Sequence, residues 1–135
     1  MSIRLRNVNQ SDFRFLYNLL KERNPNMNIS HKKMPTYSEH IKFVRSKPYT
    51  KWNIIEYGKQ KSGSIYLSKN NEIGIFLKKR FQGKNIAQES LKLFMKTNPR
   101  KRYLANVNPK NIISQKFFKK NGFKLIQYTY EFEVN

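Results

Sequence analysis

The sequence predicts a domain of the α/β (α+β) class, built on a central mixed, mostly antiparallel sheet. Three short strand patterns follow one another between residues 52 and 77 and are joined by turns, which is typical of an antiparallel meander. A helical pattern then separates the third strand from a fourth at 102–107, and such a crossover implies a parallel pair. A length of 135 residues suits one domain with one core, so residues 1–135 are assigned to a single unit.

The chain carries 28 lysines and arginines against 8 aspartates and glutamates, a net charge of +20. This charge suits a nucleic acid, an acidic lipid or a phosphate-rich ligand as a partner, without choosing among them. The cations are scattered along the chain, and the abundance of Lys, Asn and Ile also fits the codon bias of a low-GC genome. Whether the basic surface is functional therefore stays open.

Cysteine is absent, which excludes disulfides and thiolate metal sites, and no metal is expected. No apolar run reaches the length of a membrane span, and the first ten residues lack the apolar centre of a signal peptide. A cytoplasmic protein is the expectation.

The first third of the chain predicts one strand and two helices. Residues 3–6 alternate apolar and basic side chains, as a half-buried strand does. A capped amphipathic helix is predicted over 13–22, and the irregular stretch 23–35 is predicted to be a loop. Capping-box spacing at 36–39 predicts a second helix that ends before Pro48.

The middle of the chain predicts a hairpin of strands 52–57 and 64–68, followed by a third strand over 72–77. The loop 78–85 is polar and basic and contains one glycine. From residue 86 the apolar residues fall on one face of a helix.

The last third predicts a strand at 102–107, a helix that begins at Asn108-Pro109, a C-cap at Asn121-Gly122, and a closing strand over 123–132. The apolar face of that helix is assigned to Ile112, Ile113, Phe117 and Phe118.

The basic loop 78–85 is a candidate anion site. A helix N-terminus offers unpaired backbone N–H groups and the positive end of a dipole, and four cations precede this one. The local pattern favours a phosphate or pyrophosphate ligand. The alternative is an ordinary strand–loop–helix connection with a solvated basic turn.

Two segments carry a family resemblance. Gln82, Asn85 and Ala87 follow the pattern (Q/R)-x-x-G-x-(G/A), except that asparagine replaces the glycine. Residues 111–123 follow N-x-x-(A/S)-x-x-x-(Y/F)-x-K-x-G-F without a gap. With these segments in this order, the chain resembles the GNAT family of acyl-CoA-dependent N-acyltransferases over essentially its whole length.

The resemblance implies helices on both faces of the sheet and a parallel, splayed strand pair that holds acetyl-CoA as co-substrate. The loop amides would bind the pyrophosphate, the strand before the loop would pair with pantetheine, and the last helix would contact the pantetheine arm. The implied cofactor-binding residues are Ile75, Phe76, Leu77, Gln82, Gly83, Lys84, Asn85, Ile86, Ala87, Asn111 and Ser114. For Asn111 the alternative is a helix cap.

The implied reaction is attack of a primary amine on the acetyl thioester. Glu72 is the candidate general base and Glu56 the alternative, and a backbone N–H near Phe76 or Leu77 would stabilise the oxyanion. Phe118 stands where the family usually has a tyrosine as general acid, and phenylalanine cannot donate a proton. Tyr128 and Tyr130 are the candidate substitutes, with packing residues as the alternative.

The acceptor side resembles acetyltransferases that modify amino groups of nucleotide-linked sugars, through a pattern (R-N)…(E-H-x-x-F). Arg23 would meet a diphosphate, and His31 and His40 are further candidate substrate-binding residues. Protein N-termini and small amines are alternative acceptors. A catalytically silent module that binds RNA, the ribosome or another anionic partner is the competing function, and a homodimer stays open.

Overall fold

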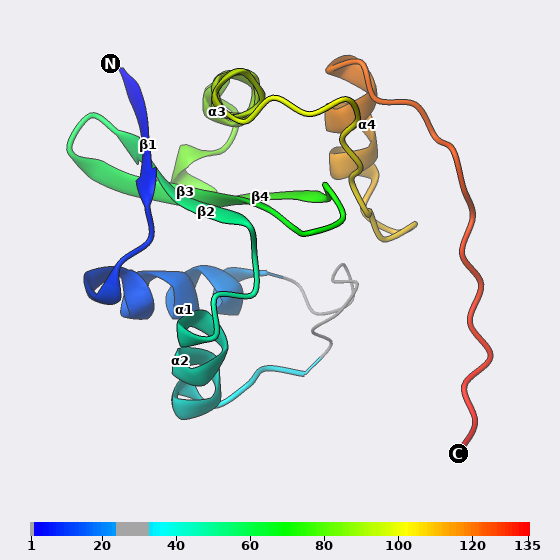
Figure 1. Cartoon of the computed structure of the whole chain (residues 1–135), viewed down its shortest axis with the longest axis horizontal. Helices are drawn as coiled ribbons and strands as arrows, with labels where there is room; N and C mark the ends of the chain where they lie inside the picture. Colours follow the sequence, from blue (N-terminus) through cyan, green and yellow to red (C-terminus); the bar gives the residue numbers. More distant parts are fainter. Residues whose placement is uncertain (1, 24–32) are drawn as a thin grey trace.

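The computed structural model describes residues 2–23 and 33–135, and its described part forms one sheet between two layers of helices (Figure 1). The α1 and α2 helices lie on one face of the sheet, and α3 lies on the other. The strands are β1 (Ile3–Asn7), β2 (Lys51–Tyr57), β3 (Gln60–Leu67) and β4 (Ile73–Leu77). The helices are α1 (Phe13–Glu22), α2 (Tyr37–Arg45), α3 (Ile86–Thr97) and α4 (Ile112–Lys120).

The four strands form an antiparallel sheet in the order β1-β2-β3-β4, so each strand pairs with its neighbour in the sequence. The register places Ile3 opposite Tyr57 and Ile65 opposite Ile75. The predicted α/β (α+β) class, the hairpin and the meander are thereby confirmed.

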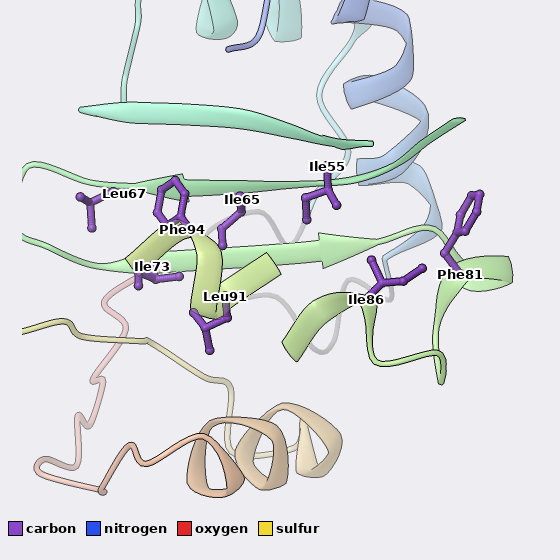
Figure 2. Close-up of a cluster of buried hydrophobic side chains, with 8 residues drawn as sticks. All are labelled: Ile55, Ile65, Leu67, Ile73, Phe81, Ile86, Leu91 and Phe94. Carbon is purple, nitrogen blue, oxygen red and sulfur yellow. The ribbon is translucent and has the colours of Figure 1, made fainter. Parts of the chain in front are cut away.

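Two consecutive residues of β2 show that both faces of the sheet are covered. Ile54 and Ile55 have no exposed surface, and successive side chains in a strand point to opposite faces. Ile54 packs with Leu16 of α1 and Val44 of α2. Ile55 belongs to the larger cluster under α3, whose side chains Figure 2 shows between the sheet and that helix. Its members are Ile55, Ile65, Leu67, Ile73, Phe81, Ile86, Leu91 and Phe94.

A buried ion cluster joins β1 to the start of α1. Asp12 has no exposed surface, and its two carboxylate oxygens each accept a hydrogen bond of 2.8 Å from the Arg6 guanidinium. The ammonium of Lys61 lies 2.7 Å from Asp12 Oδ1, and the Asn9 backbone N–H donates to Oδ2 at 2.9 Å. Burial raises the pKa of Asp12, but these hydrogen bonds outweigh it and hold the pKa at about 2.

The predicted parallel crossover is present, but it forms only one bridge between the two segments. After α3, Leu104 forms one isolated parallel bridge with Glu72. The Ile73 N–H donates to the Leu104 carbonyl at 2.7 Å, and the Leu104 N–H donates to the Asn71 carbonyl at 2.8 Å. The parallel sense is confirmed, but the full strand predicted over 102–107 is reduced to this bridge.

The predicted closing strand over 123–132 is wrong, because these residues carry no strand assignment in the structure. They follow α4 as an extended segment that runs away from the sheet, drawn from orange to red in Figure 1. The pattern gives strand propensity, but a strand forms only against a hydrogen-bonding partner.

The α4 helix also differs from the prediction. It begins at Ile112 rather than at Asn108-Pro109, because the Asn111 side chain accepts a hydrogen bond of 3.1 Å from the Ser114 N–H and caps it there. Its predicted apolar face is only partly buried. Phe117 packs against the core under α3, whereas Ile112 and Ile113 are exposed.

Within residues 2–23 and 33–135, no helix is both long enough and apolar enough to cross a membrane.

Candidate active site

The outer edge of β4, meaning the side away from β3, is the first component of the site. Ile73 donates its N–H outward to Leu104, and backbone groups of successive strand residues point alternately to the two sides. Those of Ile75 and Leu77 therefore point to the outer edge, whereas Phe76 pairs with β3. Of the two N–H groups expected to serve an oxyanion, only that of Leu77 has the required direction.

The basic loop after β4 turns the chain sharply into α3. Phe81 is buried in the core and anchors the loop, and the exposed residues after it lead to the buried Ile86 at the start of the helix. Gly83 has φ +77° and Asn85 has φ +63°, both in the left-handed region. Asn85 thus adopts the conformation for which glycine is favoured, as asparagine can at some cost.

The first backbone N–H groups of α3 are the candidate anion-binding groups of this loop. The Asn85 carbonyl accepts its first bond in the helix from Glu89, so the N–H groups of Ile86, Ala87 and Gln88 precede the helical ladder. One of the four cations expected to help them is engaged elsewhere. Lys78 lies 2.8 Å from Glu22, and the Lys78 hydrogen bond lowers the pKa of that carboxyl against the opposing effect of burial.

Glu72 directly precedes β4 and forms the parallel bridge with Leu104. Its Oε1 accepts a hydrogen bond of 2.9 Å from the Ser68 hydroxyl, and its Oε2 accepts one from the Asn106 side-chain amide. Asn106 follows Leu104, so this contact links β4 to the segment across from it. Two acceptor contacts orient the carboxylate, which is what a general base needs.

Glu56, the alternative base, lies elsewhere. It is at the opposite end of the sheet from Glu72, since β2 places Lys51 opposite Leu67 and Glu56 opposite Lys61. Its Oε2 accepts a hydrogen bond of 3.0 Å from Arg6. Geometry therefore favours Glu72 over Glu56.

A largely aromatic pocket of about 120 Å³ lies on the opposite side of β4, between the sheet and the α1 and α2 helices. It is lined by Leu16, Leu19, Leu20, Arg23, Pro35, Glu39, His40, Phe43, Tyr49, Trp52, Ser64, Tyr66 and Phe76. The guanidinium carbon of Arg23 lies 3.8 Å from the centre of the Phe76 ring. Burial lowers the pKa of Arg23, which stays a cation at neutral pH.

A stacked tyrosine pair forms one wall of this pocket. The rings of Tyr49 and Tyr66 lie 3.8 Å apart and within 6° of parallel. Tyr66 packs over Gly74 of β4 so closely that a Cβ there would lie 2.2 Å from the ring. Burial raises the pKa of both hydroxyls, so they stay protonated at neutral pH. The sequence pattern did not predict the Tyr49–Tyr66 pair. The available signal concerned Tyr66 alone, which lies on the same face of the sheet as Phe76.

The structure brings some predicted substrate residues together and separates others. Arg23 and His40 both line the pocket, and His40 is buried. His31 lies outside the described residues. Tyr128 and Tyr130 are exposed on the segment after α4 and do not line the pocket.

Asn111 and Ser114, expected to contact the cofactor, form the N-terminal cap of α4. The cap is the alternative that the sequence left open for Asn111, and a ligand role stays a prediction. In the described parts of the chain, no group of three or more His, Asp or Glu side chains could hold a metal ion.

Known proteins share this architecture. The acetyltransferase (GNAT) domain family matches residues 2–124. A search of curated proteins finds no match. A solved domain from Methanocaldococcus jannaschii is 26% identical, with a TM-score of 0.81, over 96% of this chain and 93% of its own.

Two solved enzymes are similar at lower identity. RimL, a ribosomal L7/L12 alpha-N-protein acetyltransferase in complex with coenzyme A, is 20% identical, with a TM-score of 0.76, over 94% of this chain and 82% of its own. AAC(6')-Iy, in complex with a bisubstrate analogue, is 16% identical, with a TM-score of 0.75, over 100% of this chain and 99% of its own. At these identities the two structures show a shared fold.

Proposed function

The chain belongs to the acetyltransferase (GNAT) domain family, and we propose that it transfers acetyl from acetyl-CoA to the primary amine of an amino-sugar nucleotide. One observation carries the proposal: β4 serves both halves of the site. Its outer edge presents Ile75 and Leu77 beside the basic loop, while Phe76 projects into the pocket that contains Arg23. A thioester along the outer edge and an amine from the pocket would therefore meet at this strand.

The cofactor side uses backbone groups. The N–H groups at the start of α3 would bind the pyrophosphate, helped by the exposed cations of the loop. Ile75 and Leu77 would pair with the pantetheine arm as a neighbouring strand does. The remaining predicted contacts, from Gln82 to Ala87 and from Asn111 and Ser114, stay part of this proposal.

In the chemical step, Glu72 takes the proton from the amine through intervening water molecules as nitrogen attacks the thioester carbon, because it lies five residues, about 16 Å, along the strand from Leu77. The Leu77 N–H stabilises the oxyanion of the tetrahedral intermediate. Collapse breaks the C–S bond, and the departing thiolate takes a proton from an acid. Tyr66 is a protonated hydroxyl within the pocket and suits this role. Tyr128 and Tyr130 could serve only where the segment that carries them docks beside β4.

The residues of the pocket favour an anionic acceptor that carries a sugar. Arg23 supplies a fixed positive charge, and guanidinium groups bind phosphate through paired hydrogen bonds. The rings of Tyr49, Tyr66 and Phe76 offer flat apolar surface for a sugar face. The net charge of +20 attracts an anionic acceptor and disfavours a polyamine.

The test combines binding with turnover. Labelled acetyl-CoA is offered with a nucleotide-linked amino sugar, the same amino sugar without its nucleotide, a peptide with a free N-terminus, and an aminoglycoside. We expect acetyl-CoA to raise the melting temperature and turnover to be highest with the nucleotide-linked sugar. Transfer to the peptide or the aminoglycoside alone would refute this acceptor but keep the family activity.

The competing function is a silent module that binds RNA or the ribosome. Its signature would be no thermal shift with acetyl-CoA together with RNA binding that weakens steeply as salt rises. That result would refute the enzyme proposal as a whole.

A further inference from the structure

The C-terminal end of α1 contacts the chain at the point where β4 becomes the basic loop. Glu22 is the last residue of α1, and its side chain is partly buried. Its Oε2 lies 2.8 Å from the ammonium of Lys78, and its Oε1 accepts a hydrogen bond of 3.0 Å from the Lys79 backbone N–H. Both carboxylate oxygens of Glu22 therefore bind residues that directly follow β4.

Glu22 caps a short turn that lies far from it in the sequence. Lys79–Phe81 form the 3-10 turn η3, and the first N–H of this turn is the one that Glu22 accepts. Lys78, which precedes the turn, supplies no side-chain cap of its own. An acceptor at this position satisfies an N–H that the turn itself leaves unpaired. The cap also links α1, on one face of the sheet, to the loop that leads to α3 on the other face (Figure 1).

The next residue of the chain contacts the last part of β4 from the same side. Arg23 follows Glu22, and its guanidinium carbon lies 3.8 Å from the centre of the Phe76 ring. Contacts from the end of α1 therefore fall on residues 76, 78 and 79. These positions flank Leu77, whose N–H is the proposed donor to the oxyanion.

The hydrogen bonds of the sheet end at this point. The pairing of β4 with β3 stops where Leu77 lies opposite Gly63, and the Lys78 N–H then donates to the Ser62 carbonyl at 2.8 Å. The ends of strands open more readily than their centres do. Glu22 holds the chain immediately beyond this end, so it limits the movement of the backbone that carries the donor.

We propose that Glu22 is a positioning residue for acetyl transfer, which keeps the end of β4 in place so that the Leu77 N–H stays directed at the oxyanion. The inference rests on the proposed function, which assigns that N–H its role. A misplacement of about 1 Å can cost about two orders of magnitude in rate, because an oxyanion donor acts only over a narrow range of distance. Glu22 acts through Lys78 and Lys79 and not on the reacting atoms.

Cofactor binding should depend on Glu22 much less than the rate does. The amides proposed to bind the pyrophosphate belong to the start of α3, and the loop before them is anchored by the buried Phe81. Removing Glu22 takes a negative charge from the basic loop and frees the Lys78 ammonium, and both changes favour an anion. A lower kcat without a weaker affinity for CoA is therefore the signature of positioning, whereas a general loss of structure would weaken both.

The experiment compares two changes at one position with a matched control. Glu22→Ala removes both contacts, whereas Glu22→Gln keeps an oxygen for the Lys79 N–H and loses the charge. Glu89→Gln is the control, because it removes one negative charge from an exposed side chain in the first turn of α3. We measure kcat with whichever amine of the acceptor panel the protein acetylates, and the dissociation constant of CoA by calorimetry, at a temperature at which circular dichroism shows every variant folded.

We expect Glu22→Ala to lower kcat by about tenfold or more and Glu22→Gln to lower it less, because the glutamine keeps one of the two contacts. The dissociation constant of CoA should stay within about twofold of the wild-type value or fall in both variants. The control Glu89→Gln should leave kcat unchanged.

The outcomes separate this inference from the proposed function. An unaltered kcat in Glu22→Ala, beside an active wild-type protein, would overturn the inference and keep the function. An equal fall of kcat in the control would overturn it as well, since loss of charge alone would then be the cause. So would CoA binding that weakens by the same factor as kcat, because Glu22 would then support the whole loop. Absence of both CoA binding and turnover in the wild-type protein would refute the proposed function, and the inference with it.

Discussion

Replacing Asp12 by asparagine tests how much the ion cluster between β1 and α1 stabilises the fold. The pKa of Asp12 lies at about 2, against an ordinary value of 3.8. This lowering corresponds to about 2.5 kcal/mol of folding free energy contributed by the ionised carboxylate at neutral pH. We therefore expect Asp12→Asn to lower the free energy of unfolding by about 2.5 kcal/mol or more, since Arg6 and Lys61 also lose an anionic partner.

The contribution of Asp12 to stability should decrease as the pH falls. The folded-state pKa lies below the unfolded-state value, so the contribution is complete above the unfolded value and is lost as the pH falls through about 2. Roughly half of it should be gone by about pH 3. The difference in stability between the wild-type protein and Asp12→Asn should therefore narrow as the pH falls.

Urea denaturation of both proteins at neutral pH and at several acidic pH values measures this difference. Glu89→Gln is the control, because Glu89 is an exposed carboxyl on α3 and should change stability by less than about 0.5 kcal/mol. A gap between wild type and Asp12→Asn that stays constant from neutral to acidic pH would show that the buried carboxylate is not the source of the stability.

Changes at four further positions test the site. Glu72→Gln should cut turnover by about two orders of magnitude with acetyl-CoA affinity unchanged, and an unaltered pH–rate profile would remove Glu72 as the base. Gly83→Leu should weaken acetyl-CoA binding measured by calorimetry, in addition to the roughly 1 kcal/mol of stability that a side chain costs at its positive φ, and a loss of stability alone would favour a structural role for the loop. Asn85→Gly should preserve the melting temperature, whereas Asn85→Ala should cost about 1 kcal/mol, because only the alanine is strained at a positive φ. Arg23→Gln should raise KM for a diphosphate-bearing acceptor about tenfold while leaving KM for acetyl-CoA unchanged, and an equal change in both would argue against a role in acceptor binding.

Elements whose signals are local were predictable. The α1 helix spans the predicted residues 13–22, because its apolar period lies within the segment and the capping box of Asn9 and Asp12 comes directly before it. The capping box at Thr36 and Glu39 forms with both reciprocal hydrogen bonds. The meander of β2, β3 and β4 was predictable because short turns join its strands, whereas the pairing of β1 with β2, across two helices, was not predicted.

Features that depend on distant partners were not. Residues 123–132 have a clear strand pattern, yet no strand forms there, because the pattern does not supply a hydrogen-bonding partner. The pocket combines Arg23 after α1, Tyr49 before β2 and Tyr66 of β3, and only the packing of α1 on the sheet brings them together. The Asn106 contact with Glu72 depends likewise on where the single parallel bridge forms.

Acetyl-CoA bound along the outer edge of β4 would stabilise the protein as well as serve as its substrate. An unpaired strand edge invites pairing with another chain and is a recognised origin of aggregation. A pantetheine arm bound along Ile75 and Leu77 would occupy that edge as a surrogate strand. The cofactor should then protect the protein during storage and heating, and preparations stripped of it should lose solubility before they lose helical structure.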